Sequence, residues 1–404
     1  MYQLAKVASD TGAVMSVLQQ NQAKPQGGAA PAPKAINFRR SAFEHEEPIT
    51  VQTVTMTTAT QPLPLVNIPA YGFLRGVWIK VALTGGTGGT AFQYDGYASI
   101  LQTITLQDTS GNPLYGPIVQ GALGSPGLSQ FIQKYGGYGA YFDPQVMGQD
   151  LTGSIPNITY WYYIPIEILK RNGLGSITNL NAAAAYQLSM TVNSSGNVFT
   201  STPSPQPTVT VSTYFDAWSQ PPAHDVLGNQ TTQRPPALNT TQFWTVSTFP
   251  VNAGFQKVQL TRLGYYLRNL IFIFVSAAGI RADSVTPLQL EVWKDNQPVI
   301  QQDISLWRQK TYRDFGYAGN AGTTLNTSSV PASGVQDTGV YPLPFCNDFG
   351  LLVGDELRNG YLPTLQSTKL EVRGTFQAGG TLVVLTNDVA PPDSNESIFI
   401  PVTL

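Results

Sequence analysis

The stretch Tyr71-Gly-Phe-Leu-Arg-Gly-Val-Trp-Ile-Lys-Val81 returns in altered form as Gly264-Tyr-Tyr-Leu-Arg-Asn-Leu-Ile-Phe-Ile-Phe274. The shared dipeptides Leu74-Arg75 and Leu267-Arg268 lie 193 positions apart. In the first copy, apolar residues alternate with other residues from Val77 to Leu83, which is the period of a strand with one buried face. The pair therefore predicts the same strand in two copies of one domain.

Three further matches follow in the same order along the chain. They pair Ile104–Asp108 and Pro113 with Leu290–Asp295 and Pro298, Tyr186–Val192 with Thr368–Gly374, and Val209–Asp216 with Thr381–Asp388. The offset falls from 193 to about 172, so the first copy has longer loops, including the 44-residue uncharged run from Asn172 to Phe215. A repeat of this length is a whole domain, since solenoid units have periods of only about 20 to 50 residues.

Composition favours turn-rich β structure. The 404 residues include 38 Gly and 30 Pro but only 11% charged residues, against about 25% in an ordinary soluble domain. This argues against helical bundles and coiled coils, while 42% hydrophobic content is too high for a disordered chain. Turn clusters such as Asp108–Pro113 and Asn193–Asn197 predict that neighbouring strands are antiparallel.

Each copy holds six to eight strand candidates and one short helical patch, at Gly127–Tyr135 and at Ile304–Phe315. Eight antiparallel strands in two facing sheets form a jelly roll, which buries one face of every strand and limits exposed edges. We therefore expect an all-β protein with two tandem eight-stranded jelly rolls and an N-terminal amphipathic helical arm. The expected domains are residues 1–45 (arm and tether), 46–220 (first jelly roll), 221–242 (linker), 243–392 (second jelly roll) and 393–404 (C-terminal tail).

The arm is predicted from apolar residues at helical spacing within the first 24 residues, followed by the Pro- and Gly-rich tether Pro25–Pro33. Residues 1–40 carry a net charge of +4. Arg39 and Arg40 are interpreted in two ways, as ligands for phosphates of lipid or genome, or as a solvated hinge. The candidate interaction residues of this region are Leu4, Val7, Val14, Met15, Leu18, Arg39 and Arg40.

The sequence contains no pattern typical of catalysis, of a cofactor or of a metal site. The two histidines, His45 and His224, lie in polar connections, and adjacent carboxylates in Glu44-His-Glu-Glu47 would point to opposite faces of a strand. Cys346 is interpreted as a packed small side chain, and Gly85–Gly89 as a hairpin loop, because no Lys-Ser or Lys-Thr follows it. We therefore expect no enzyme activity and no cofactor.

Asp143, Asp150 and Glu167 are close enough in the sequence to suggest paired carboxylates, as in a glycosidase. With 24 scattered acidic residues, such groupings are expected by chance.

Targeting signals are also missing from the sequence. Met1–Asp10 lacks the pattern of a signal peptide, and a single cysteine cannot form an internal disulfide, so we expect cytoplasmic synthesis. The most apolar stretch, Asn269–Ile280, has 12 uncharged residues, too few for a membrane-spanning helix. A formal net charge of -2 without a Lys/Arg run predicts no sequence-specific nucleic-acid binding.

Two tandem jelly rolls in about 400 residues, preceded by an amphipathic arm and a tether, resemble the double jelly-roll major capsid proteins of tailless icosahedral viruses. The resemblance is greatest to the tectivirus-like phages with an internal membrane. It implies a homotrimer whose six upright barrels form a pseudo-hexagonal capsomer, self-assembly into a virion shell, and an arm that faces inward. Neighbouring capsomers, minor capsid and vertex proteins and an internal lipid membrane are the partners that the resemblance suggests.

Low charge suits this role independently, because a buried unpaired charge in a subunit contact is costly. The alternative functions are a carbohydrate-binding or glycoside-hydrolysing β-sandwich protein, which would gather aromatic and acidic residues in one concave site, and a viral spike or surface-layer protein.

Overall fold

The computed structural model describes residues 35–86, 92–93, 95–119, 127–137, 158–169, 173–236, 241–315, 338–345 and 360–390. Several sequence predictions lie outside these ranges, namely the arm helix with Leu4, Val7, Val14, Met15 and Leu18, the tail 393–404, Cys346, Asp143 and Asp150. No helix in the described ranges is long and apolar enough to span a membrane.

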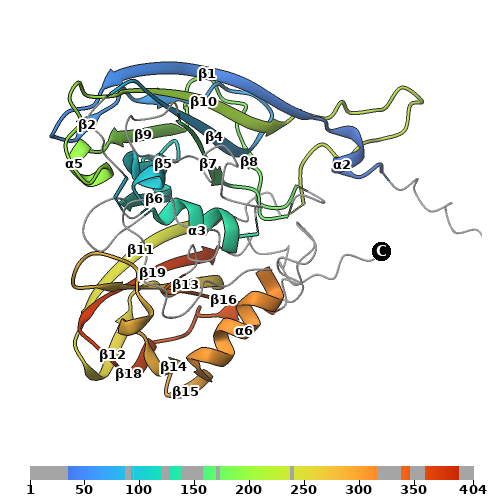
Figure 1. Cartoon of the computed structure of the whole chain (residues 1–404). Helices are drawn as coiled ribbons and strands as arrows, with labels where there is room; N and C mark the ends of the chain where they lie inside the picture. The colour runs from blue at the N-terminus through green and yellow to red at the C-terminus, as the bar shows by residue number, and fades with distance from the viewer. Residues whose placement is uncertain are drawn as a thin grey trace, which may run out of the picture.

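The strands between Glu44 and Trp218 form two facing antiparallel sheets, at the top of Figure 1. They are β1 (Glu44–Thr55), β2 (Gln61–Pro62), β3 (Val66–Asn67), β4 (Phe73–Thr84), β5 (Leu101–Gln107), β6 (Pro113–Val119), β7 (Ile158–Pro165), β8 (Ile177–Thr178), β9 (Gln187–Val192) and β10 (Thr208–Trp218). One sheet has the order β1-β10-β4-β7, with β8 paired to the start of β4. The other has the order β2-β9-β5-β6, with β3 also paired to β9.

The strands between Gln242 and Val389 form a second pair of sheets, at the bottom of Figure 1. They are β11 (Gln242–Val251), β12 (Gly254–Leu260), β13 (Tyr266–Ser276), β14 (Pro287–Lys294), β15 (Gln297–Asp303), β16 (Val340–Pro344), β17 (Leu362–Pro363), β18 (Leu370–Phe376) and β19 (Gly380–Val389). Their orders are β11-β19-β13-β16, with β17 beside β13, and β12-β18-β14-β15.

The two sets have the same topology. With β2 and β3 counted as one strand and the short β8 and β17 left out, each set has eight strands in the spatial orders 1-8-3-6 and 2-7-4-5. The four sequence matches fall on equivalent strands, β4 with β13, β5 with β14, β9 with β18 and β10 with β19. The prediction of two tandem eight-stranded jelly rolls is therefore confirmed.

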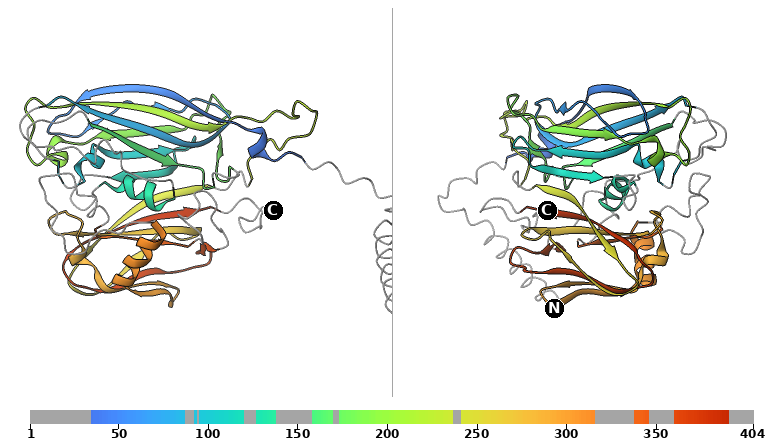
Figure 2. Two further views of the ribbon diagram at one scale, coloured as in Figure 1. Left: turned by 45° about the vertical axis from the view of Figure 1, so that its right-hand side comes forward. Right: turned by 90° about the vertical axis from the view of Figure 1, so that its left-hand side faces the viewer.

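The two jelly rolls are stacked on each other, so that the four sheets lie in successive layers (Figures 1 and 2). The sheets β2-β9-β5-β6 and β11-β19-β13-β16 are also joined by a short parallel pairing of β6 with β11, at Tyr115 and Trp244. One apolar cluster accordingly contains residues of both halves, including Tyr115, Trp244 and Ile271. The stacking makes the sheet β11-β19-β13-β16 an internal layer of the molecule.

This layering explains why equivalent strands differ in polarity. In β4 the side chains of Val77, Ile79 and Val81 are buried in the first core, while alternate positions face outward and stay partly exposed. In β13 every residue from Leu267 to Val275 is buried, because one face lines the second core and the other contacts the first jelly roll. A strand covered on both faces is expected to be continuously apolar, which accounts for the apolar stretch Asn269–Ile280.

Short helices occupy the connections. They are α2 (Phe38–Ser41), η1 (Gly96–Ser99), α3 (Leu128–Tyr135), α5 (Ser195–Val198), η2 (Asp283–Val285) and α6 (Ile304–Phe315). Helices α3 and α6 both follow the fifth strand of their jelly roll, so both predicted helical patches are confirmed. Helix α3 lies between the two jelly rolls, whereas α6 packs on β14, β15 and β16 of the second (Figure 1).

Candidate functional site

The structure brings a repeated arginine to the same end of both jelly rolls. The pairing of β4 with β10 passes from Gly76 opposite Asp216 to Leu74 opposite Ala217, so Arg75 is left out of the ladder as a bulge. The pairing of β13 with β19 skips Arg268 in the same way. A bulge redirects the side chain of the extra residue, and both guanidinium groups are buried.

The bulges also correct the sequence alignment by one residue. Because Gly76 pairs with Asp216 and Asn269 pairs with Asn387, the structural equivalent of Asp216 is Asn387. The sequence match had placed Asp216 opposite Asp388. The contacts agree with the structural register, since Nη1 lies 3.0 Å from Oδ1 of Asp216 in the first copy and 3.0 Å from Oδ1 of Asn387 in the second.

In the first jelly roll, Arg75 forms the centre of a buried ionic cluster. Its Nε lies 3.0 Å from Glu167 Oε2, and its Nη1 lies 3.0 Å from Asp216 Oδ1 and 3.2 Å from Glu44 Oε2. Its guanidinium carbon is 4.2 Å from the centre of the Trp218 ring, and the indole Nε1 donates to Glu167 Oε1 at 2.7 Å. We call these five residues the arginine cluster; it contains three carboxylates around one guanidinium.

Burial and this excess of carboxylates raise the pKa of Asp216. Burial raises the pKa of Asp216 to about 7, although Arg75 acts in the opposite direction, and the nearby Glu167, Glu46 and Glu44 raise it further. A carboxylate surrounded by others in a dry site is expected to hold its proton to a higher pH.

Replacing Asp216 with Asn, which reproduces Asn387 of the second copy, is expected to change how stability depends on pH. With a pKa of about 7, folded Asp216 keeps its proton at pH values where the unfolded chain, with a pKa of about 3.9, has lost it. The resulting stabilisation is present below about pH 4 and is lost as the pH rises to 7, by up to about 4 kcal/mol. Urea unfolding of both proteins between pH 4 and 8 measures this; parallel curves would contradict it.

The beginning of the described chain is attached to this cluster. Phe38 of α2 packs with Ala42, Phe73 and Trp218 in a small apolar cluster, and the Arg39 guanidinium also lies over the Trp218 ring, at 4.4 Å. The two oxygens of Glu44 contact Arg39 Nη2 and Arg75 Nη1, each at 3.2 Å.

Arg40 is exposed, and its backbone N–H donates to Oδ1 of the N-cap residue Asn37. Thus α2 holds Arg39 against the first jelly roll and leaves Arg40 at the surface. We call the region around α2 and the two bulges the arm end of the molecule.

In the second jelly roll, the repeated arginine binds the first jelly roll instead. Arg268 Nη2 donates to the carbonyl of Gly136 at 3.0 Å, and Asn269 Nδ2 donates to the carbonyl of Tyr135 at 2.7 Å. These carbonyls lie at the C-terminus of α3, where helix carbonyls lack intrahelical partners and a positive charge is favourable. The charge of Arg268 is therefore placed against a helix terminus, and a neutral Asn387 is sufficient beside it.

A chain of hydrogen bonds connects the two arginines. Gln242 Nε2 donates to the carbonyls of Ile166 and Glu167, at 3.1 and 3.0 Å, and its Oε1 accepts from Asn387 Nδ2 at 3.0 Å. Glu167 holds Arg75 and Asn387 holds Arg268, so the connection runs through the arm end of both jelly rolls.

A second ionic contact joins the jelly rolls. Arg281 Nε and Nη2 lie 2.7 and 3.1 Å from the two oxygens of Asp95, and Nη1 donates to the carbonyl of Thr338 at 2.6 Å. Both Arg281 and Asp95 are 1% exposed, and the guanidinium lies 4.9 Å from the centre of the Phe131 ring. Two-point pairing fixes orientation as well as distance, so this contact and Arg268 hold α3 and the two jelly rolls together.

The outward face of the first jelly roll carries an aromatic cluster that we call the aromatic face. Trp78, Trp161, Tyr163 and Tyr214 are partly exposed on the sheet β1-β10-β4-β7, with ring centres 4.4 to 6.3 Å apart in the contacting pairs. Lys80 lies among them, 5.6 Å from the centre of the Trp161 ring. Large aromatic side chains with few charges are typical of contact surfaces.

The structure also shows where the other residues singled out in the sequence lie and what they contact. The segment Glu44–Glu47 is part of β1, and His45 stacks on Tyr71 at 4.2 Å and lies 3.2 Å from Glu47 Oε2. Glu167 belongs to the arginine cluster. Among the described residues, no group of three or more His, Cys, Asp and Glu side chains could hold a metal ion.

Sequence reasoning missed the arginine cluster and the contacts between the jelly rolls. One signal was available, because Leu-Arg is the best-preserved dipeptide of the repeat and places a charge within an apolar strand in both copies.

Comparison of the sequence with family models and with curated proteins finds no match. Comparison of the structure with solved structures finds matches. A crystal structure of the STIV MCP superposes with a TM-score of 0.57 at 12% identity, covering 86% of this chain and 97% of that chain. The atomic structure of Sulfolobus Turreted Icosahedral Virus gives 0.55 at 15% identity, with coverages of 86% and 90%.

The PBCV-1 virus capsid gives a TM-score of 0.51 at 11% identity, and the match covers 89% of this chain and 95% of that chain. The neighbours found are double jelly-roll major capsid proteins. This chain has the double jelly-roll fold. The matches cover 97%, 90% and 95% of these neighbour chains, so both jelly rolls are matched. In this double jelly-roll chain, the contacts of Arg268 and Arg281 hold the two jelly rolls together.

Proposed function

We propose that the protein is a major capsid protein that assembles with copies of itself into the shell of a virion. One observation carries this proposal: the same eight-stranded topology occurs twice in one chain, stacked face to face, as in structures described as a virus and a virus capsid. The virion is then the site of action, and synthesis in the host cytoplasm follows as an expectation from the sequence.

A homotrimer is favoured by the way the two jelly rolls use equivalent faces. Trp78 and Lys80 of the aromatic face correspond, at the offset of 193, to Ile271 and Ile273. The latter two are buried against the first jelly roll within the same chain. The duplication thus leaves one face of this type covered and its equivalent, the aromatic face, open.

The side of the second jelly roll away from the first is also open, and it exposes apolar side chains. These are Phe255 on β12, Leu288 on β14 and Leu306 on α6. If the contact between the two jelly rolls of one chain is repeated between neighbouring chains, this side packs on the aromatic face of the next chain. Such a heterologous contact forms a closed ring when its rotation is suitable, and three chains then supply six jelly rolls.

Removing the aromatic face is expected to weaken the trimer. Trp161→Ser with Tyr214→Ser deletes two aromatic side chains of the type that dominates contact energies, so we expect the trimer to dissociate about 30-fold more readily or worse. Light scattering coupled to size-exclusion chromatography over a dilution series measures this. Phe43→Ser, which removes an apolar side chain that is 61% exposed at the arm end, is the control and should have little effect.

Three results are informative. An unchanged trimer in the double variant would reject the aromatic face as the contact but keep the ring. A wild-type monomer would reject the trimer, and a monomer that binds glycans would favour the carbohydrate-binding alternative.

We further propose that the arm acts in assembly and faces inward. Its candidate contacts are Leu4, Val7, Val14, Met15 and Leu18 with Arg39 and Arg40, and its candidate partners are neighbouring capsomers, an internal membrane, and minor capsid or vertex proteins. The exposure of Arg40 within the anchored helix α2 supports this, because it leaves a cation free to contact another surface.

Deleting Met1–Lys24 is expected to leave a folded trimer that no longer forms complete shells. The reason is that α2 and β1 remain and keep their contacts with Trp218 and β10. Circular dichroism and light scattering test folding and trimer mass, and negative-stain electron microscopy tests assembly. Normal shells from the truncated protein, or loss of folding, would contradict this prediction.

A further inference from the structure

Two hairpin turns of this protein have the same geometry but differ in the polarity of the residues at their tips. In Asp108-Thr-Ser-Gly-Asn112 and Asp225-Val-Leu-Gly-Asn229, the first Asp accepts from two backbone N–H groups and from the side chain of the final Asn, at 2.8 to 3.0 Å. In each turn the Gly has a positive φ, 86° at Gly111 and 82° at Gly228. The tip residues are therefore not required by the turn itself.

The second turn nevertheless exposes apolar side chains. Val226 is fully exposed and Leu227 is 82% exposed, whereas the equivalent positions of the first turn are the polar Thr109 and Ser110. Exposing two branched aliphatic side chains has no benefit for folding, and such an arrangement is typical of a contact site.

The hairpin that carries this tip, residues 221–233, is held in place and projects from the molecule. Its strands are joined at His224 and Gln230, and Ile36 of the incoming chain forms a parallel bridge with Thr231. In this bridge the Ile36 N–H donates to the carbonyl of Gln230 at 2.9 Å, and the Ile36 carbonyl accepts from the N–H of Thr232 at 2.8 Å. Figures 1 and 2 show it extending past the ends of β1 and β10, beside α2. The hairpin lies within the linker that the sequence predicts at residues 221–242.

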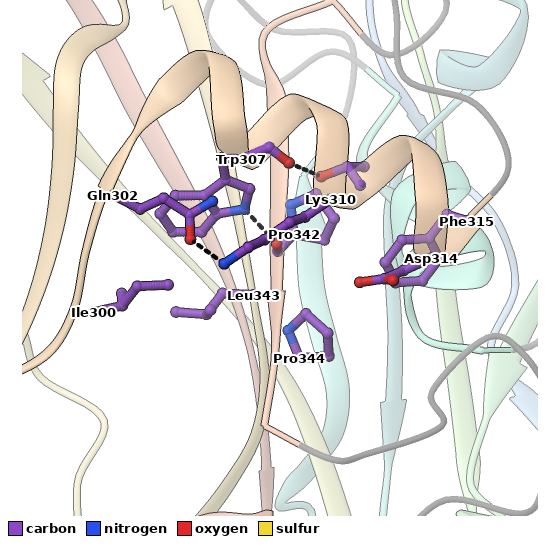
Figure 3. A pocket seen from close by; sticks show the side chains of 10 residues that line it. Ile300, Gln302, Trp307, Lys310, Asp314, Phe315, Pro342, Leu343 and Pro344 are labelled. Atoms are coloured by element: carbon purple, nitrogen blue, oxygen red, sulfur yellow. Dashed lines mark hydrogen bonds between the residues drawn. The ribbon is translucent and has the colours of Figure 1, made fainter.

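The same chain contains a pocket of suitable chemistry beneath α6, which we call the α6 pocket. It has a volume of about 190 Å³, and a cavity of roughly 150 Å³ is enough to hold a benzene ring. In Figure 3, Trp307 and Lys310 of α6 lie above Ile300 and Leu343 of the strands. The walls are thus mainly apolar.

Two charged side chains line the α6 pocket, Lys310 and Asp314, and Asp314 Oδ1 is paired with Arg313 Nε at 2.6 Å. Lys310 Nζ donates to Gln302 Oε1 at 2.9 Å, and within the described ranges no ion pair of Lys310 with an acid occurs. Asp225 stands next to the apolar tip of the hairpin and remains a carboxylate, because hydrogen bonds from Asn229 lower its pKa. The apolar tip therefore matches the pocket walls in polarity, and Asp225 is opposite in charge to Lys310, the charged lining residue that forms no ion pair within the described ranges.

The hairpin and the pocket lie at the same end of the molecule. Leu343 and Pro344 in the pocket pair with Leu270 and Asn269, directly after the bulge at Arg268. That bulge belongs to the arm end, where the hairpin also emerges. In the proposed ring, the aromatic face of one chain meets the sheet β12-β18-β14-β15 of the next, and α6 packs on β14 and β15 of that sheet. This arrangement brings the hairpin of the first chain toward the α6 pocket of the second.

We propose that Val226 and Leu227 of one chain insert into the α6 pocket of the neighbouring chain and lock the ring at the arm end. The proposal rests on the trimer described under the proposed function. It assigns the tip a second copy of this chain as its partner, through apolar insertion with Asp225 near Lys310.

Cysteine cross-linking tests the contact directly in the full-length protein with Cys346→Ser. Leu227→Cys combined with Lys310→Cys should give covalently linked chains on mild oxidation of the trimer. The control Ser110→Cys with Lys310→Cys, on the matched turn, should not. Separately, Val226→Thr with Leu227→Ser should make the trimer dissociate at least tenfold more readily, while Thr109→Ala with Ser110→Ala should leave it unchanged.

Each result supports or overturns the proposal. A stable trimer without cross-links, whose dilution behaviour is unaffected by Val226→Thr with Leu227→Ser, overturns the docking and leaves the trimer intact. A wild-type monomer removes the trimer itself. If the tip variant loses binding to anionic phosphatidylglycerol vesicles while the trimer is unaffected and cross-links are absent, the partner of the tip is lipid, and the proposal is wrong.

Discussion

Replacing Arg281 with Met is expected to lower the free energy of unfolding by about 3 to 5 kcal/mol. The substitution keeps the size of the side chain but leaves the carboxylate of Asp95, which is 1% exposed, without its two charged hydrogen bonds. It also removes the donor to the carbonyl of Thr338. Because the pair joins the first jelly roll to the second, the loss should separate their unfolding into two transitions, which urea titration followed by tryptophan fluorescence can resolve.

Two controls define this result. Adding Asp95→Asn to Arg281→Met should restore part of the lost stability, because the buried group left behind is then neutral. Arg313→Met removes an arginine that is 73% exposed in its pair with Asp314 and should cost about 1 kcal/mol or less. A loss below about 1 kcal/mol in Arg281→Met would show that the pair is not needed to hold the jelly rolls together.

Replacing Arg75 with Met is expected to cost a similar amount, about 3 to 5 kcal/mol at pH 8. The variant leaves Glu167 and Asp216 buried without the guanidinium that contacts both at 3.0 Å. The cost should be smaller at pH 5, because Asp216, whose pKa burial raises to about 7, is then mainly protonated. Urea unfolding at the two pH values gives the difference.

The matched control for Arg75 is Arg39→Met. Arg39 contacts the same Glu44 and the same Trp218 ring, but it is 44% exposed, so its loss should cost about 1 kcal/mol or less. Equal losses for Arg75→Met at pH 5 and pH 8 would contradict the idea that uncompensated charge is the cause.

Much of the fold follows from local pattern. The period of two from Val77 to Leu83 predicts a strand with one buried face, and β4 buries those residues. The helical patches at Gly127–Tyr135 and Ile304–Phe315 are α3 and α6. The duplication was visible because equivalent strands keep similar apolar spacing.

Less of the candidate site than of the fold could be predicted from the sequence. The sequence indicates Arg75 and Arg268 only through their repeated position. It does not predict that Arg75 contacts Glu167 while Arg268 contacts the end of α3. The alignment of Asp216 with Asp388 was wrong by one residue, because the compensating bulge appears only in the pairing of strands. The hairpin within the predicted linker 221–242 was not foreseen, because the pairing of Thr231 with Ile36 spans almost 200 residues of chain.

The amino-acid sequence by itself determined which segments form strands and helices, that a domain is present twice, and that both copies use the same order of elements. These are consequences of backbone geometry and of apolar spacing, which act between residues a few positions apart. The tertiary structure alone decided that one sheet is covered on both faces while its equivalent exposes Trp78 and Trp161, and that Arg281 meets Asp95. Those outcomes depend on which distant surfaces exclude water from each other, and that is settled only when the two jelly rolls are packed together.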